Sequence, residues 1–218
     1  MRPPRYPVVP RQRGSRSVHD HPCDRPSTAP SVMLEPLRRV RQIRHFTAEP
    51  LTDAQVTAIV DVGRWSGSSR NSQPWRFIVL RDAAVLLRLA TLGTPSTRAL
   101  ATATVAIAVA MPVDPDHAVS LAYDDGRASE RMLIAASVLR LGAAIAWLPP
   151  RVRPIAGAML GLPEDRVVRT LIALGHPAPE ALAPRPPGTP ARLPRSETVA
   201  HERWPPMHEH DRPPDPTY

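Results

Sequence analysis

Four short apolar segments constrain the fold of this chain more than any other feature. Each is rich in the bulky and β-branched residues that favour strands. They are WRFIVLRD at 75–82, TVAIAVAM at 104–111, AAIAWL at 143–148 and RTLIALG at 169–175. Segments with helical spacing of apolar residues lie before and between them. Because helices and strands do not alternate regularly, the sequence predicts an α+β protein rather than a series of βαβ units.

Five segments carry apolar residues three or four positions apart and are predicted to be helical. They are residues 34–46, 51–65, 82–90, 125–141 and 152–163. The second begins with a capping box, because Thr52 is able to accept from the backbone of Gln55 while Gln55 reaches back. Its predicted buried face consists of Val56, Ile59, Val60 and Gly63. Asp125 is expected to be the N-cap of the fourth helix rather than a catalytic acid.

The 218 residues, of which 42% are hydrophobic, suit one domain with flanking tails. Residues 1–32 combine Pro, Arg, Ser and His without an apolar period, so they are predicted to be a disordered tail, with Met33 as a possible true start. The domain is expected at 33–204, with a Pro-rich arm at 177–194 and a second disordered tail at 205–218.

The charge and the cysteine content narrow the class of protein. The chain has no Lys, and its net charge of +8 is divided between the domain and the first 32 residues, whose six Arg and two Asp carry half of it. The distribution therefore speaks against a nucleic-acid partner. A single cysteine, Cys23, excludes a disulfide framework and favours the cytoplasm. The longest apolar run, 99–111, is too short for a membrane span, and no metal-ligand cluster is expected.

Two polar clusters precede the first strand-like segment. In RQIRHF, Arg41 and Arg44 would lie on one face of a helix and could grip one phosphate, although a solvated basic face is the alternative. In SGSSRNSQPW (66–75), small residues let backbone N–H groups approach an anion, and Asn71 and Gln73 offer amides to the edge of a heterocycle. A turn held by its own side chains is the alternative there.

The motifs together resemble the FMN-dependent nitroreductase family. In order along the chain they are RQIRHF, SGSSRNSQPWRFIVLRD, YDDGRASERMLIAASVLRLG, LGLPEDRVVRTLIALGHP and ARLPRSETVAHERW. The resemblance covers roughly residues 34–204, and its sharpest element is N-x-Q-P-W before a strand. It implies a nitroreductase-like α+β fold with a mixed central sheet flanked by helices. It also implies a homodimer joined through the long helices, with FMN at the subunit interface.

The resemblance also implies roles for the arginines. Arg41 and Arg44 would hold the FMN phosphate and ribityl region, and Gln42 stands between them where the family usually has Ser. Arg192, at the end of the Pro-rich arm, falls on a late Arg of the family that reaches the same phosphate. From its position alone, a lone Arg in an arm is expected to face water.

The loop residues are assigned by the same comparison. Ser68 and Ser69 would contact the flavin or its ribityl chain, Asn71 would bind the pyrimidine edge, and Gln73 completes the motif. A further N–H group usually bonds flavin N5 in this family, but Pro149 and Pro150 stand at that place and have none. The donor must come from Trp147, Leu148 or a residue beyond the prolines, and Leu148 is included in the predicted site.

The implied activity is that of an FMN oxidoreductase. NADH or NADPH would deliver hydride to the flavin, and a small-molecule acceptor such as a nitroaromatic or a quinone would then receive the electrons. Because the flavin carries the chemistry, no catalytic side chain is predicted. Three alternatives remain: a dehalogenase or flavin-fragmenting enzyme on the same fold, a scaffold that binds flavin poorly, and a basic nucleic-acid-binding protein.

Overall fold

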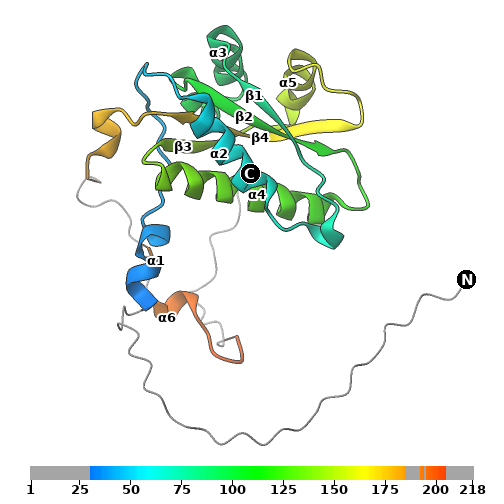
Figure 1. The fold of residues 1–218 in the computed structure, drawn as a ribbon. Helices are drawn as coiled ribbons and strands as arrows, with labels where there is room; N and C mark the ends of the chain where they lie inside the picture. Colours follow the sequence, from blue (N-terminus) through cyan, green and yellow to red (C-terminus); the bar gives the residue numbers. More distant parts are fainter. Residues whose placement is uncertain (1–29, 185–191, 194, 205–218) are drawn as a thin grey trace, which may run out of the picture. The chain divides into compact units, whose positions relative to one another are not determined.

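The computed structural model describes residues 30–184, 192–193 and 195–204 (Figure 1). The chain divides into two compact units, residues 1–40 and 41–218. In the first unit, α1 (Pro30–Arg38) begins inside the segment 1–32 that is predicted to be disordered, and Met33 lies within this helix. Residues 1–29, 185–191, 194 and 205–218 lie outside the described part, so most of the first predicted tail, all of the second tail and a part of the Pro-rich arm are not tested.

A four-stranded sheet forms the centre of the second unit. Its strands are β1 (Arg76–Leu80), β2 (Val105–Pro112), β3 (Gly142–Trp147) and β4 (Arg166–Gly175), in the order β1-β2-β4-β3. The four predicted strands and the α+β class are confirmed. The sheet is antiparallel at each of its three pairings between described strands, so the prediction of a mixed sheet is wrong. The central strands β2 and β4 are the most buried.

Helices cover both faces of this sheet, as Figure 1 shows. On one face lie α2 (Asp53–Arg64) and α4 (Ala118–Val138), which pack against each other and, through α4, against β2, β3 and β4. On the other face lie α3 (Ala83–Leu92) and α5 (Arg153–Met159). The short helix η2 (Arg98–Ala101) contacts both α3 and β3, which brings it to the β3 end of that face.

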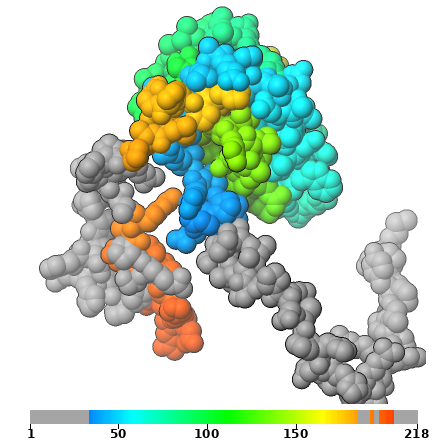
Figure 2. Space-filling model, turned by 60° about the vertical axis from the view of Figure 1, so that its left-hand side comes forward, coloured from blue at the N-terminus to red at the C-terminus, as the bar shows by residue number. Residues whose placement is uncertain are grey.

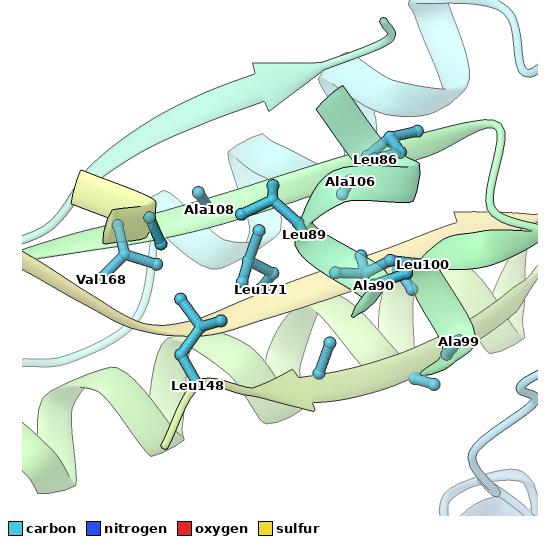
Figure 3. Close-up of a cluster of buried hydrophobic side chains, with 14 of the residues drawn as sticks. Leu86, Leu89, Ala90, Ala99, Leu100, Ala106, Ala108, Leu148, Val168 and Leu171 are labelled. Atoms are coloured by element: carbon cyan, nitrogen blue, oxygen red, sulfur yellow. The ribbon is translucent and has the colours of Figure 1, made fainter. Parts of the chain in front are cut away.

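The face under α3 and α5 is lined with small side chains. In β2, Ala106, Ala108 and Ala110 belong to this buried cluster, and Leu171 of β4 pairs across from Ala108. Figure 3 shows Leu86 and Leu89 of α3 lying over these strands. Because methyl groups occupy little depth, the helix side chains fill the space above the sheet. The alternate residues of β2, which are Val105, Ile107, Val109 and Met111, are buried on the opposite face.

Helix α2 confirms the predicted capping box and α4 departs from its predicted start. The Thr52 side chain accepts from Gln55 N–H at 3.2 Å, and Gln55 bonds back to Thr52 N–H at 2.9 Å. Helix α4 begins at Ala118, so Asp125 is buried in mid-helix and is not the N-cap. The helix starts earlier because the Asp114 carboxylate accepts from the N–H groups of the residues just before it and fixes that turn.

Residues 39–46 are not helical, which corrects the prediction for 34–46. The chain runs extended beside β3, where Ile43 N–H donates to the Ala143 carbonyl at 2.8 Å and Phe46 forms an isolated bridge with Pro177. Two glycines make this close approach possible. A Cβ at Gly142 would lie 2.9 Å from Ile43, and one at Gly175 would lie 2.7 Å from Phe46. The apolar spacing that suggested a helix therefore reflects burial against the end of the sheet.

Candidate functional site

The extended segment separates the side chains of Arg41 and Arg44. Arg41 donates to the carbonyls of Ala181 and Ala183 at 3.0 and 3.5 Å and so ties down the end of the short helix η4 (Pro179–Leu182). Arg44 instead donates to the Gln42 side-chain oxygen at 3.0 Å. The predicted grip of both guanidinium groups on one face of a helix does not occur, because residues three apart in an extended chain point to opposite sides.

Gln42 attaches this segment to the outer edge of β3. Its side-chain oxygen accepts from the Ile145 N–H at 3.2 Å as well as from Arg44. The amide of Gln42 thus connects the Arg44 side chain to the backbone of β3. The result is that the Arg44 guanidinium is held beside the edge of β3.

A pocket of about 550 Å³ lies at this edge. Its lining consists of Gln42, Arg44, Pro95, Ser96, Arg98, Ile145 and Trp147. This volume lies within the range of about 300–1,000 Å³ that is usual for small-molecule and cofactor sites. Gln42 and Arg44 are among the residues predicted from the sequence, whereas Ser96 and Arg98 are not. The only local signal for these two was a Thr-Pro-Ser turn followed by an arginine, which sequence reasoning has no reason to join to residues 42–44.

The pocket is positively charged. Arg44 and Arg98 both line it, both side chains are exposed, and none of the lining residues is acidic. Within the part of the chain that the structure describes, neither guanidinium group forms an ion pair with a carboxylate. Two guanidinium groups without an acidic partner provide N–H donors and charge for a phosphate.

Along β3, successive backbone N–H groups point alternately toward β4 and away from the sheet. Leu148 N–H points inward and donates to the Arg169 carbonyl at 2.8 Å, and the Leu148 side chain is fully buried. The prediction that Leu148 contributes a donor is therefore contradicted, because this N–H is already bonded. Ile145 N–H points outward to Gln42. Trp147 lies two residues after Ile145 in β3 and pairs with Thr170 of β4. Its N–H therefore also points outward, away from β4.

The loop that contains SGSSRNSQPW has an unusual backbone. Arg70, Asn71 and Gln73 have positive φ angles of 51°, 55° and 46°, a region that residues other than Gly rarely occupy. The loop is held by Ser68, whose hydroxyl accepts from Gln73 N–H at 2.9 Å, and by Ser69, whose N–H donates to Asp124 at 3.0 Å. The turn predicted as the alternative reading is therefore present.

The same loop leaves its two amide side chains exposed. Asn71 and Gln73 are exposed, and no bond of either side chain to the described residues is found. Strained backbone that presents free polar side chains is characteristic of ligand-binding sites. The turn and the ligand loop are thus compatible, with Ser68 and Ser69 shaping a loop that presents Asn71 and Gln73.

The loop and the pocket lie at opposite edges of the sheet. The loop leads directly into β1, whereas the pocket borders β3, and the order β1-β2-β4-β3 puts two strands between them. Three strand spacings correspond to about 14 Å. The structure therefore brings Gln42 and Arg44 together but does not bring Asn71 or Gln73 to them within one chain.

Two remaining predictions concern Arg192 and metal binding. Arg192 is exposed in the short described stretch 192–193, and nothing in the structure tests its predicted role. Among the described residues, no group of three or more His, Cys, Asp and Glu side chains is placed to hold a metal ion. None of the described helices combines the length and the apolar character that a bilayer crossing requires.

Known proteins resemble this chain in both sequence and fold. The profile of the nitroreductase family matches residues 37–110. A protein of Archaeoglobus fulgidus, provisionally named an NADH dehydrogenase/NAD(P)H nitroreductase, is 31% identical over 144 residues, which are 64% of this chain and 82% of that protein.

Two solved structures illustrate the likeness in fold. A nitroreductase-like protein of Desulfovibrio desulfuricans in complex with FMN has a TM-score of 0.63 and 31% identity over 79% of this chain and 97% of its own. The NADPH:FMN oxidoreductase of Vibrio harveyi complexed with NAD⁺ has a TM-score of 0.69 at 23% identity, covering 80% and 79% of the two chains. The fold is thus one of α+β oxidoreductases. By fold and by sequence, the chain belongs to the nitroreductase family, which confirms the resemblance and the predicted enzyme class.

Proposed function

We propose that the protein is an FMN-dependent oxidoreductase that uses NADH or NADPH. The observation that carries this proposal is the pocket at the edge of β3, where Arg44 and Arg98 have no carboxylate partner among the described residues. The solved D. desulfuricans relative contains FMN, and the V. harveyi structure contains NAD⁺. When bound, FMN supplies the redox chemistry between the nicotinamide donor and a small acceptor such as a nitroaromatic or a quinone.

The chain's own residues would bind and orient this cofactor. Arg44 and Arg98 supply positive charge and forked N–H donors for its phosphate or for the carbonyl oxygens of its ring. Gln42 holds Arg44 in place and still has its side-chain N–H₂ group to donate. In this proposal, Arg41 has a structural role, because it holds the backbone carbonyls of residues 181 and 183. To contact a phosphate, its guanidinium group would have to give up these hydrogen bonds.

Trp147 replaces Leu148 as the proposed backbone donor to the redox end of the flavin. Its N–H points away from β4, and its side chain, which is 44% exposed, lines the pocket. Arg153 donates to the Leu148 carbonyl at 2.9 Å and lies 5.2 Å from the Trp147 ring centroid, so the end of the strand is held in place. Pro149 and Pro150 have no N–H and leave Trp147 as the nearest outward donor.

Two copies of the chain would complete each site. The loop that presents Asn71 and Gln73 lies across the sheet from the pocket, so a partner's loop would have to supply these amides. The surface of α2 and α4, which lie side by side in Figure 2, offers a suitable dimer interface. Val119 and Tyr123 of α4 are 72% and 71% exposed, and Trp65 at the end of α2 is 73% exposed. Burying such large apolar side chains favours association.

The experiment that tests the proposal is a flavin spectrum. We expect purified protein, incubated with FMN and desalted, to retain the yellow absorbance of the cofactor. Arg44→Ala should weaken FMN binding about 10- to 100-fold, because a hydrogen bond to a charged group contributes about 1.5–3 kcal/mol. Arg88→Ala, at an exposed arginine of α3, is the matched control and should leave the affinity unchanged. Colourless protein after desalting would refute the assignment of FMN.

Different experiments distinguish the three alternative functions. A different flavin reaction, such as dehalogenation or flavin fragmentation, uses the same cofactor and is distinguished by assaying products. A scaffold that binds flavin poorly predicts weak binding in the flavin experiment. A nucleic-acid-binding protein predicts a salt-dependent gel shift by residues 33–204, and the absence of that shift is our expectation. The cytoplasmic location is a prediction that fractionation of cells would test.

A further inference from the structure

A second basic pocket, of about 350 Å³, lies on the other side of the molecule beside the loop 68–75. It is bordered by that loop, by the turn between β2 and α4, and by the start of β4. Three arginines line it, namely Arg70 from the loop, Arg76 from β1 and Arg166 from β4. None of them belongs to the pocket at the edge of β3.

The carboxylates of this pocket are already bonded to other groups. Asp114 lies 2.8 Å from His117 Nδ1, and this hydrogen bond, with those from two backbone N–H groups, lowers the pKa of its carboxyl. Asp124 accepts from Ser69 N–H, and its nearest cationic partner is Arg127, at 3.9 Å. Neither carboxylate forms an ion pair with the three arginines in the described part of the chain. Arg166 also lies 4.0 Å from the carboxylate of the exposed Asp165, at the limit of an ion pair. Arg70 and Arg76 form no ion pair with a carboxylate of the described residues, so their charge remains available to a ligand.

Two of the three arginines are held in place by backbone carbonyl groups. Arg166 donates one N–H to the Pro74 carbonyl at 2.8 Å, and Arg76 donates to the Trp75 carbonyl at 2.8 Å. A guanidinium group has five N–H donors, so each retains donors for a bound anion. Arg70 is exposed, and its backbone conformation, with a positive φ of 51°, fixes the direction of its Cα–Cβ bond. Ordering of the cationic groups before binding lowers the entropic cost of binding an anion.

We propose that this pocket binds a phosphate monoester, and that its ligand is the 2′-phosphate by which NADPH differs from NADH. The first part rests on the three arginines and on the hydroxyl groups of Ser72 and Ser120 that share the lining. The second part rests on the proposed function, in which the same loop supplies Asn71 and Gln73 to the flavin site of the partner subunit. Gln73 also lines the basic pocket, so a donor whose nicotinamide lies at that flavin site would extend its adenosine end toward the three arginines.

Ligands without a nicotinamide test this pocket independently of the reaction. Calorimetric titration of the full-length, FMN-loaded protein with 2′,5′-ADP, 5′-AMP and inorganic phosphate compares the possible sources of the phosphate. We expect 2′,5′-ADP to bind at least about tenfold more tightly than 5′-AMP, since each charged hydrogen bond contributes about that factor. Arg70→Asn should remove most of this difference. Asn tolerates positive φ better than most residues other than Gly, so this change preserves the loop.

A second variant and a control complete the test. Arg166→Gln removes a second charge, and it should also weaken 2′,5′-ADP about tenfold. Arg88→Gln makes the same change of charge on the exposed surface of α3 and should have no effect. The flavin absorbance of each variant shows whether its fold and the proposed flavin site are intact, so a failure of this pocket is distinguishable from a failure of the proposed function.

The outcomes separate as follows. Equal binding of 2′,5′-ADP and 5′-AMP by yellow wild-type protein would overturn the assignment of the 2′-phosphate. Tight binding of inorganic phosphate that is lost in Arg70→Asn, without a preference for 2′,5′-ADP, would support an anion pocket and overturn its link to the donor. Binding of 2′,5′-ADP that both variants leave unchanged would overturn the pocket itself.

Discussion

Asp125 illustrates how burial changes a side chain that the sequence suggests is a helix cap. It is 4% exposed, and its carboxylate accepts from Ser129 and Thr170 at 3.2 Å each. Burial raises the pKa of this carboxyl, while the two hydroxyl groups and the charges of Arg169 and Arg153 partly oppose the shift. The buried carboxyl therefore joins α4 to β4 at a cost in stability when it is ionised.

The pH dependence of stability should show this cost. The folded protein binds the Asp125 proton more tightly than the unfolded chain does, whose Asp pKa is about 3.9. Asp125 therefore contributes most to the free energy of unfolding below the pKa of the unfolded chain. This contribution is lost as the pH rises through the raised pKa of the folded protein, and it stays lost at higher pH. We expect Asp125→Asn to be more stable than the wild type at pH 7 in urea unfolding, with a smaller difference near pH 4.

A control variant isolates the effect of burial. Glu164→Gln removes an exposed carboxylate and should change stability little at either pH. If Asp125→Asn were less stable than the wild type at both pH values, the hydrogen bonds from Ser129 and Thr170 would outweigh the cost of desolvation, and the explanation would be wrong.

At the scale of the elements, the sequence predicts the segments with a regular apolar spacing but not the contacts between distant segments. The four strands and the capping box of α2 follow from local composition, and the structure contains them all. The spacing of Ile43 and Phe46 predicts a helix at residues 39–46, yet tertiary contacts with Gly142 and Gly175 determine the conformation of this segment. Tertiary packing often overrides such local preferences.

Some residues of the candidate site are likewise indicated by local motifs, whereas others depend on long-range contacts. Asn71 and Gln73 stand in a motif with a distinctive sequence, and Arg44 was found because it lies near other arginines. Ser96 and Arg98 reach the same pocket only because η2 contacts β3, a long-range contact that a single sequence does not reveal. The direction of the N–H groups in β3 also depends on the register with β4, so the sequence alone does not show that Leu148 N–H is bonded to the Arg169 carbonyl.

The loop 68–75 allows its structural and ligand roles to be tested separately. Asn71→Gly retains the backbone at φ 55° and removes the amide, whereas Asn71→Ala also adds strain of about 1 kcal/mol. If Asn71 binds the flavin, both variants should lose about tenfold in FMN affinity, while only the Ala variant should unfold at a lower temperature. Unchanged FMN affinity in Asn71→Gly would assign the residue to the turn alone.

At the scale of the whole molecule, the separation of pocket and loop predicts complementation between subunits. Arg44→Gln damages the pocket, and Asn71→Gly damages the loop that a partner would supply. Neither variant alone has an intact site in a homodimer. After subunit exchange, half of the dimers contain one chain of each kind, and about a quarter of all sites should be intact. We expect flavin binding and NAD(P)H oxidation to recover to that extent.

The mixing experiment also tests the alternative that one chain builds a complete site. In that case, each chain of the mixture would remain damaged in its own site, and activity would not exceed the mean of the two variants. Mixing either variant with itself is the control for concentration and exchange. Placing a charge on the exposed face of α4 by Tyr123→Asp should prevent recovery, because this side chain is 71% exposed in a single chain.

The absence of lysine gives the pocket at the edge of β3 a property beyond its charge. Both of its cationic side chains are arginines, and a guanidinium group remains protonated throughout the range in which proteins are stable. A phosphate monoester, in contrast, gains its second negative charge near pH 6. Any change in affinity between pH 5 and pH 9 would thus report the ionisation of the ligand. Reagents that acylate amines would not block the pocket, whereas reagents selective for guanidinium groups would.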